Sequence, residues 1–182
     1  MEKNQLRQQL REQRRALSSA EIERYSAAVC ERLRDLCRGK RCVMAYLSAF
    51  HEVCVDDAIR ELLKSGGTVA VPVTDAETGK ITPYALHDLN AVHRGAYGIR
   101  EPIKTEEISK EQIEAVLVPG VGFDRSGGRL GFGKGCYDRF LADFSGLRIG
   151  ICYEFQLVEK IETEERDVPM DMIITEKNCY VI

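Results

Sequence analysis

The chain has 182 residues, of which 44% are apolar and 30% are charged, so it is long enough to form one ordinary domain with a buried core. Its net charge of −3 argues against bulk nucleic-acid binding, and no apolar segment approaches the length of a membrane span. The seven cysteines are odd in number and lack metal-ligand spacing, so we expect reduced thiols in a cytoplasmic protein.

Positive charge gathers in the first part of the chain. Residues 1–41 contain 11 Lys and Arg against 6 Asp and Glu, a net charge of +5, whereas the remainder carries −8. Such a segment is compatible with a nucleic-acid or membrane arm, a solvated face or one wall of an anion site. Because it lacks the interleaved aromatic residues on which bases stack, we expect no nucleic-acid partner. We expect no membrane partner either.

Residues 3–17 are predicted to form a helix with two contrasting faces. At about 100° per residue, four cations share one face: Lys3, Arg7, Arg11 and Arg14. The neighbouring face carries Leu6, Leu10 and Leu17. The leucines can therefore dock while the cations face a cleft, although a solvated basic face fits the same spacing.

The next elements alternate between helix and strand. A second helix begins after Ser18, which is placed to form a capping box with Glu21, and it ends near Gly39. Residues 42–47 predict a buried strand. The loop of residues 48–52 follows its carboxyl end, where open α/β sheets place ligand groups.

The middle of the chain predicts a helix followed by two strands and a long connection. The helix runs from about residue 56 to 64, and the strands cover residues 68–73 and 81–86. Residues 90–107 read as irregular, and irregular segments of this length are usually functional or disordered.

The most distinctive stretch covers residues 116–141. A short apolar strand breaks at Pro119, and a loop rich in glycine leads to apolar residues at helical spacing over 137–144. The loop glycines are Gly127, Gly128, Gly131, Gly133 and Gly135. Without Cβ atoms, successive N–H groups can converge on an anion, close to the N-terminus of the following helix.

Arg129 and Lys134 add positive charge to this loop, which therefore predicts a phosphate site. Glycine-rich loops without ligands are also common, so spacing alone leaves that alternative open. The loop is not a Walker A motif, because no Gly-Lys-Ser/Thr follows. It also lacks the early strand–glycine–helix unit of a dinucleotide fingerprint.

Two further strands, at residues 148–153 and 172–175, complete the alternation. Alternating helices and strands predict a parallel sheet covered on both faces. We therefore expect residues 1–182 to form a single three-layer α/β/α domain with a mainly parallel central sheet.

Residues 119–138 follow the pattern P-G-x-x-F-D-x-x-G-x-R-L-G-x-G-x-G-x-Y-D. With this pattern the chain resembles the 5-formyltetrahydrofolate cyclo-ligase family, also called methenyltetrahydrofolate synthetase. Matches elsewhere extend the resemblance from end to end: Lys3, Leu6, Arg7, Glu52, the segment 97–102 and Asp171. Two positions depart from the family, Phe132, where Tyr or Arg is frequent, and Cys136, where the first of two tyrosines is usual.

The resemblance implies an ATP-dependent conversion of 5-formyltetrahydrofolate to 5,10-methenyltetrahydrofolate, with release of ADP and phosphate. The γ-phosphoryl group would move to the formyl oxygen, and N10 of the same molecule would then attack and close the ring. Mg²⁺ would assist, and the small-molecule partners would be ATP and a reduced folate. We expect a monomer. The alternative is a folate- or nucleotide-binding paralogue with an altered substrate or lost turnover.

The resemblance also implies roles for individual residues. The catalytic residues would be Arg129 and Lys134. The ATP site would comprise Lys3, Arg7, Arg129, Leu130, Gly131, Phe132, Gly133, Lys134, Gly135, Cys136 and Tyr137. The folate site would comprise Glu52, Tyr97, Phe132, Gly133, Lys134, Gly135 and Cys136. The metal ligands would be Asp138 and Asp171.

Overall fold

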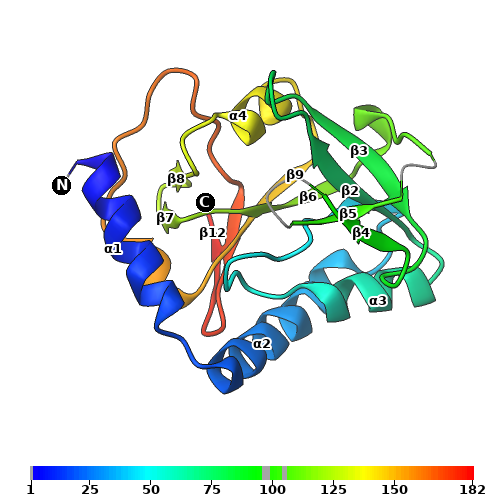
Figure 1. Ribbon diagram of the computed structural model, residues 1–182, viewed down its shortest axis with the longest axis horizontal. Helices are drawn as coiled ribbons and strands as arrows, with labels where there is room; N and C mark the ends of the chain where they lie inside the picture. Colours follow the sequence, from blue (N-terminus) through cyan, green and yellow to red (C-terminus); the bar gives the residue numbers. More distant parts are fainter. Residues whose placement is uncertain (1, 96–98, 104–105) are drawn as a thin grey trace.

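A sheet of seven strands organises the molecule in the computed structural model, which describes residues 2–95, 99–103 and 106–182 (Figure 1). From edge to edge the strands are β12 (Cys179–Val181), β11 (Met172–Ile174), β9 (Leu147–Ile151), β6 (Ala115–Pro119), β1 (Cys42–Met44), β2 (Thr68–Thr74) and β3 (Ile81–Leu86). The inner strands run parallel, and only the two edge strands are antiparallel to their neighbours. The predicted mainly parallel sheet is confirmed.

Helices cover both faces of this sheet. On one face lie α2 (Ser19–Cys37) and α3 (Asp56–Lys64), and on the other lies the short α4 (Cys136–Leu141) (Figure 1). Successive β1 residues alternate between the two cores: Val43 packs with the α2 and α3 side, and Met44 packs with the α4 side. This arrangement confirms the predicted three layers.

Local sequence signals explain where α2 begins. The Ser18 hydroxyl accepts a hydrogen bond from the Glu21 N–H at 3.3 Å, and the Glu21 carboxylate accepts one from the Ser18 N–H at 2.9 Å. These two bonds form the predicted capping box and satisfy donors that the first turn leaves open.

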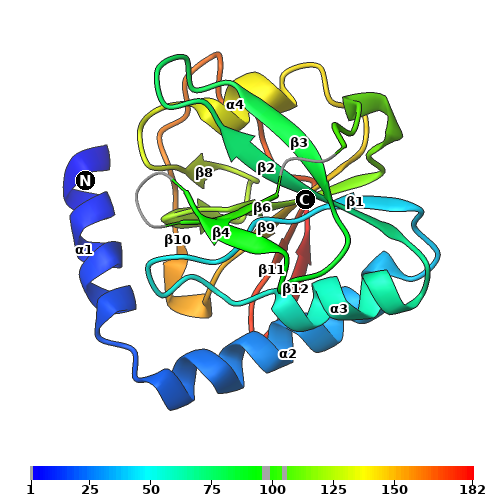
Figure 2. The ribbon, with the colours of Figure 1, turned by 45° about the vertical axis from the view of Figure 1, so that its right-hand side comes forward.

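The first helix, α1 (Lys3–Arg15), belongs to neither layer. It stands beside the main sheet (Figure 2), next to a small sheet of β10 (Leu157–Val158), β7 (Gly122–Asp124) and β8 (Arg129–Leu130). Leu10 packs there with Val121, Leu130 and Ile161. Leu6 and Leu10 therefore dock as expected, against a sheet too short to show strand periodicity in the sequence. The helix ends two residues earlier than predicted, and Leu17 packs instead against the α2–α3 core.

Other segments differ from the sequence prediction. The expected irregular segment contains β4 (Val92–Arg94), which pairs with β5 (Arg100–Pro102), and the chain also forms 3₁₀ turns η2 (Lys110–Gln112) and η3 (Glu154–Gln156). The strand expected over 42–47 ends at Met44, although residues 45–47 remain buried. Among the described residues, no helix is both long and apolar enough to cross a bilayer.

Candidate active site

The chain leaves the centre of the sheet in opposite directions at β1 and β6. These strands are parallel neighbours, but β1 leads into α3 on one face, whereas β6 leads toward α4 on the other. A topological switch point of this kind opens a crevice at the carboxyl ends of the two strands. The loop of residues 48–52 and the glycine stretch of residues 120–135 both begin there.

The glycine stretch is anchored by Asp124, which the sequence analysis did not single out. Its buried carboxylate accepts hydrogen bonds from the N–H groups of Ser126 at 2.9 Å, Gly128 at 2.9 Å and Ile161 at 2.7 Å, and from the Ser126 hydroxyl at 2.6 Å. Burial alone would raise the pKa of Asp124, but these hydrogen bonds outweigh burial and lower it. The sequence signal was an Asp two residues before a Ser, typical of an Asx turn.

Residues 131–135 form the open part of the loop. The N–H groups of Gly131, Phe132, Gly133 and Gly135 have no acceptor among the described residues. Two carbonyls of the same loop accept from arginines, Gly131 from Arg7 at 2.9 Å and Lys134 from Arg139 at 2.9 Å. N–H groups without a protein acceptor are compatible with anion binding, so the phosphate site stays a prediction at this loop.

The contribution expected from the following helix is smaller than predicted. The helix α4 has only six residues, and Gly135, at φ 61°, precedes it in the left-handed region. Because a macrodipole builds up over several turns, this short helix adds little field. The loop amides and the nearby cations must therefore supply most of any attraction for phosphate.

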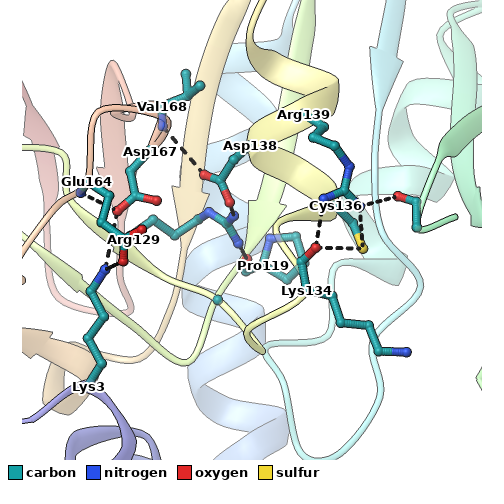
Figure 3. A network of polar contacts seen from close by, with 12 residues as sticks. Lys3, Pro119, Arg129, Lys134, Cys136, Asp138, Arg139, Glu164, Asp167 and Val168 are labelled. Atoms are coloured by element: carbon teal, nitrogen blue, oxygen red, sulfur yellow. Dashed lines mark hydrogen bonds and ion pairs between the residues drawn. The ribbon is translucent and has the colours of Figure 1, made fainter.

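Arg129 lies at the centre of the loop in a nearly closed environment, with 6% of its side chain exposed. One guanidinium nitrogen donates to Asp138 at 2.8 Å, and another donates to the Pro119 carbonyl at 3.4 Å (Figure 3). Its Nε is buried and has no acceptor among the described residues. An unmatched buried donor typically costs about 1–3 kcal/mol, so an anionic oxygen placed here would be favoured.

Two cations of α1 approach the same region. Lys3 forms ion pairs with Glu164 at 2.9 Å and Asp167 at 3.5 Å (Figure 3), and the hydrogen bond to Glu164 raises the pKa of Lys3. Arg7 reaches Gly131, as described above. The structure therefore brings Arg7 directly to the glycine loop and ties Lys3 to the segment that follows β10.

Arg14 lies beneath the loop and is 3% exposed. Its guanidinium donates to the Gly120 carbonyl at 3.4 Å and lies 5.9 Å from the ring centre of Phe132, which Arg11 approaches at 5.0 Å. Burial lowers the pKa of Arg14, and the negative charge of Glu52 opposes that shift. The sequence left open whether Arg11 and Arg14 face a cleft or solvent, and in the structure both lie on the Phe132 side of the crevice.

Glu52 enters the crevice from the loop after β1. One carboxylate oxygen accepts from the Ala49 N–H at 3.0 Å. Burial raises the pKa of Glu52, while the Ala49 hydrogen bond and the charge of Arg14 act in the opposite direction. The buried hydroxyl of Tyr137 also feels this carboxylate, and burial raises the pKa of Tyr137 well above its usual range.

The turn before Glu52 has an unusual backbone. Glu52 N–H donates to the Ala49 carbonyl at 2.9 Å, and the two central residues, Phe50 and His51, have φ values of 50° and 61°. Positive φ at both central positions is the signature of a type I′ turn, which normally contains Asn, Asp or Gly. Left-handed backbone costs an L-residue about 1–2 kcal/mol, so this turn is strained twice.

The remaining predicted residues lie in different surroundings. Lys134 extends away from the Arg129–Asp138 pair (Figure 3), and the Cys136 thiol lies 3.9 Å from the Arg139 guanidinium. Asp171 is bound through both carboxylate oxygens by Arg148 at the start of β9. The two predicted metal ligands, Asp138 and Asp171, thus each have a different arginine partner. Tyr97 lies outside the described residues.

Arg139 joins the loop to the turn between β2 and β3. Besides Lys134, its guanidinium donates to the carbonyls of Thr78 at 3.3 Å and Gly79 at 3.2 Å. A pocket of about 370 Å³ opens beside this contact, between the β2–β3 turn and α4, and is lined by residues that include Lys80, Lys110 and Phe140. Arg139 has no distinguishing signal in the sequence, because two of its three carbonyl partners, Thr78 and Gly79, lie about 60 residues earlier in the chain.

Comparison with known proteins agrees with the resemblance read from the sequence. A family model described as the 5-formyltetrahydrofolate cyclo-ligase family matches residues 1–176. A curated relative of that name from Mycoplasma pneumoniae is 30% identical over 182 residues, with 97% of this chain and all of the relative covered. Another, from Mycolicibacterium smegmatis, is 30% identical over 188 residues, with 98% and 96% covered.

Solved structures give the same answer for the fold. The NMR structure of Aquifex aeolicus 5,10-methenyltetrahydrofolate synthetase is similar to this chain with a TM-score of 0.86 and 36% identity, covering 100% of this chain and 93% of that one. A 5,10-methenyltetrahydrofolate synthetase from Mycoplasma pneumoniae gives a TM-score of 0.81 at 28% identity, covering 97% and 99%. The similarity therefore includes α1 and both loops of the crevice.

Proposed function

The chain belongs to the 5-formyltetrahydrofolate cyclo-ligase family, and we propose that it carries out the reaction of that family in the crevice between the ends of β1 and β6. The reaction converts 5-formyltetrahydrofolate to 5,10-methenyltetrahydrofolate and uses ATP as co-substrate. The observation that carries this assignment is Arg129, a buried cation whose Nε has no acceptor among the described residues, in a loop where the N–H groups of Gly131 and Gly133 likewise have none there.

The glycine loop is the proposed phosphate site. Its amides and Arg129 would bind the phosphate oxygens, and Arg7 would support them from α1. Phosphoryl transfer needs positioning and charge neutralisation more than covalent help from the protein. Arg129 and Lys134 are the proposed catalytic residues, because their positive charges would stabilise the negative charge that develops during transfer from ATP to the formyl oxygen.

Glu52 is the proposed folate residue on the other side of the crevice. A pteridine ring presents adjacent N–H donors along one edge, and a carboxylate can accept two of them in parallel. Arg14 lies close enough to favour the ionised form that such acceptance requires. Phe132 and Cys136 remain predicted wall positions, and Tyr97 remains a predicted stacking partner.

The ring-closing step follows from the chemistry of the formyl group. Transfer of the γ-phosphoryl group to the formyl oxygen breaks the β–γ bridging bond, releases ADP and makes that oxygen a phosphate ester. N10 then attacks the formyl carbon and loses its proton, and the C–O bond breaks to release phosphate. Both nucleophile and electrophile belong to one substrate, so holding it in a folded conformation would accelerate ring closure by proximity.

A magnesium ion fits the crevice only in part. Mg²⁺ prefers one or two carboxylates together with phosphate oxygens, and Asp138 is such a carboxylate beside the loop. Within the part of the chain that the structure describes, no three acidic, histidine or cysteine side chains cluster as a preformed metal site. Bound Mg²⁺ would neutralise phosphate charge, and Asp171 remains the second proposed ligand.

The proposal also includes a cytoplasmic location and a monomeric state.

The test is an absorbance assay in the long-wavelength band of a methenyl-folate. Purified protein, 5-formyltetrahydrofolate and Mg²⁺ are combined with and without ATP, and ADP is measured in parallel. We expect an absorbance increase that requires ATP and equals the ADP formed. A flat trace with both ligands bound would support the alternative, a binding paralogue that has lost turnover or changed substrate.

Substitution of the loop cations tests the phosphate site. We expect Arg129→Ala and Lys134→Ala to lower kcat/KM for ATP by about 100-fold, the scale of a lost charge-assisted contact in the transition state. Lys64→Ala is the matched control, because Lys64 lies in an exposed ion pair on α3. Loss of thermal stability in either loop variant, with ATP kinetics unchanged, would contradict the assignment.

A further inference from the structure

The turn of Ala49 to Glu52, in the loop that carries Glu52 into the crevice, has an aromatic side chain exposed to solvent. The Phe50 side chain is 56% exposed, which makes it one of the few large apolar residues outside the described core. Packing in the core therefore does not explain why a phenylalanine occupies this position.

The backbone of this turn makes the residue choice more unusual. Phe50 and His51 both occupy the left-handed region, where glycine or asparagine would be relaxed. Type I′ turns are favoured between paired antiparallel strands, but this turn follows a parallel strand and lies in an irregular segment. Strained residues of this kind gather at functional sites, where the surrounding structure holds them in place.

Glu52 itself holds the turn in this conformation. The Glu52 N–H donates to the Ala49 carbonyl at 2.9 Å, and the Glu52 carboxylate accepts from the Ala49 N–H at 3.0 Å. The second carboxylate oxygen receives no hydrogen bond from any described residue. The same short segment thus fixes a ring and an acceptor two residues apart, with one oxygen left for a donor from a ligand.

We propose that Phe50 is a specificity-determining wall of the folate subsite, with its ring stacked on the pteridine ring whose N–H edge Glu52 accepts. The inference rests on the proposed function, since Glu52 is the folate residue there. Aromatic side chains stack well on flat heterocycles, and a ring fixed by a strained backbone loses little freedom when the ligand binds.

Glycine substitutions separate the ring from the strain. Phe50→Gly removes the ring and relaxes the backbone, so the variant should fold at least as well as the wild type. We expect its KM for 5-formyltetrahydrofolate to rise about tenfold, the effect of losing one aromatic stacking partner, with the KM for ATP unchanged. His51→Gly, the matched control, relaxes the same turn and should leave the folate KM within about twofold. Phe50→Tyr should behave like wild type.

The absence of tryptophan from the sequence provides a direct binding readout. Phe50→Trp would carry the single tryptophan of the protein at the proposed wall. We expect 5-formyltetrahydrofolate to quench its fluorescence, and the ATP analogue AMP-PNP alone to leave it nearly unchanged. Val181→Trp, at a position 77% exposed on β12, corrects for absorption of light by the folate.

Three outcomes would overturn the proposal. An unchanged folate KM in Phe50→Gly, or equal quenching of Phe50→Trp and Val181→Trp, would remove the ring from the site. Equal increases in KM for Phe50→Gly and His51→Gly would assign the effect to the shape of the turn. Glu52→Gln separates failure of the Phe50 proposal from failure of the proposed folate subsite. If this variant has an unchanged folate KM, the folate subsite is assigned wrongly, and the role of Phe50 is wrong as well.

Discussion

Arg14 is buried and Glu52 is half-buried in the crevice, and no hydrogen bond joins these two charged side chains among the described contacts. Burial raises the pKa of Glu52 and lowers the pKa of Arg14, so each group is pushed toward its neutral form. Each charge also opposes the shift of the other. The ionised carboxylate is therefore maintained at some expense of stability, which is reasonable for a group that must accept hydrogen bonds from a ligand.

This balance predicts a stability change for Glu52→Gln. The folded state raises the pKa of Glu52 above its ordinary value of 4.5. Protonated Glu52 therefore contributes its full share to the free energy of unfolding below about pH 4.5, and that contribution is lost as the pH rises through the folded-state pKa. Glutamine does not ionise, so it avoids that loss, and its side-chain oxygen can still accept the hydrogen bond from the Ala49 N–H. We expect Tm at pH 7 to rise by about 2–4 °C, typical of about 1 kcal/mol at this size, while folate binding weakens. The gain should vanish below about pH 4 in melts recorded across pH.

We expect substitution of Arg14 to shift the pH dependence of kcat/KM for 5-formyltetrahydrofolate. In Arg14→Gln the pKa of Glu52 should rise further, because its nearest cation is gone and burial remains. The acidic limb of kcat/KM for 5-formyltetrahydrofolate should therefore move to higher pH, and Arg14→Lys should restore it in part. Among the described residues, the groups facing Glu52 are Arg14 on α1, Tyr46 after β1 and Tyr137 on α4. A profile of unchanged shape with a uniformly lower rate would indicate only a packing defect.

At the scale of elements, the glycine loop is held by contacts that come from distant parts of the chain. Arg7 reaches it from α1, Arg139 ties it to the β2–β3 turn, and Asp124 ties its hairpin to Ile161. Gly128 is needed in this arrangement, because a Cβ there would lie 2.6 Å from the Asp124 carboxylate. The open amides are thus positioned by a frame of side chains, consistent with the need for preorganised donors.

Arg139→Ala tests this frame. Losing the contacts to Lys134, Thr78 and Gly79 should loosen the loop, so we expect the KM for ATP to rise about five- to tenfold, while stability falls by about 1 kcal/mol or less because the side chain is exposed. Arg60→Ala, which removes an exposed pair with Asp57 on α3, should change neither quantity. Isothermal titration with AMP-PNP would check the result, and equal affinities in both variants would exclude a positioning role.

Sequence reasoning succeeded where one segment carries its own signal. The capping box at Ser18 and the pattern over residues 119–138 are local, so both could be located from the sequence alone. It failed where the meaning depends on a partner far along the chain. The Arg148–Asp171 pair requires the register of β9 against β11, and the β7–β8 hairpin has strands too short for periodicity. The strained turn at Phe50 lacks the glycine that would have marked it.

At the scale of the whole molecule, the crevice is built from segments across most of the chain. Its walls come from the α1 helix, the loop after β1, the glycine stretch and the segment around Asp167. A ligand that binds only this assembled arrangement must stabilise the folded state as a unit.

Thermal shift measures that linkage. ATP at about 100 times its Kd should add about 2.7 kcal/mol, or about 5–10 °C in Tm for a chain of this size. In Arg7→Ala the same ATP concentration should give a clearly smaller shift, because the contact from α1 to Gly131 is lost. A full shift in that variant would show that α1 does not take part in nucleotide binding.

The position of β1 has a consequence for how the protein is made. Its register pairs Val43 with Val69 on one side and with Ala115 on the other, so the strand is complete only after a segment more than 70 residues downstream has arrived. Until then a nascent chain has β2 available but leaves the other edge of β1 unpaired, with the apolar face of Met44 uncovered. Contacts this distant slow folding. A chain that stalls before β6 would therefore be prone to aggregate on the ribosome.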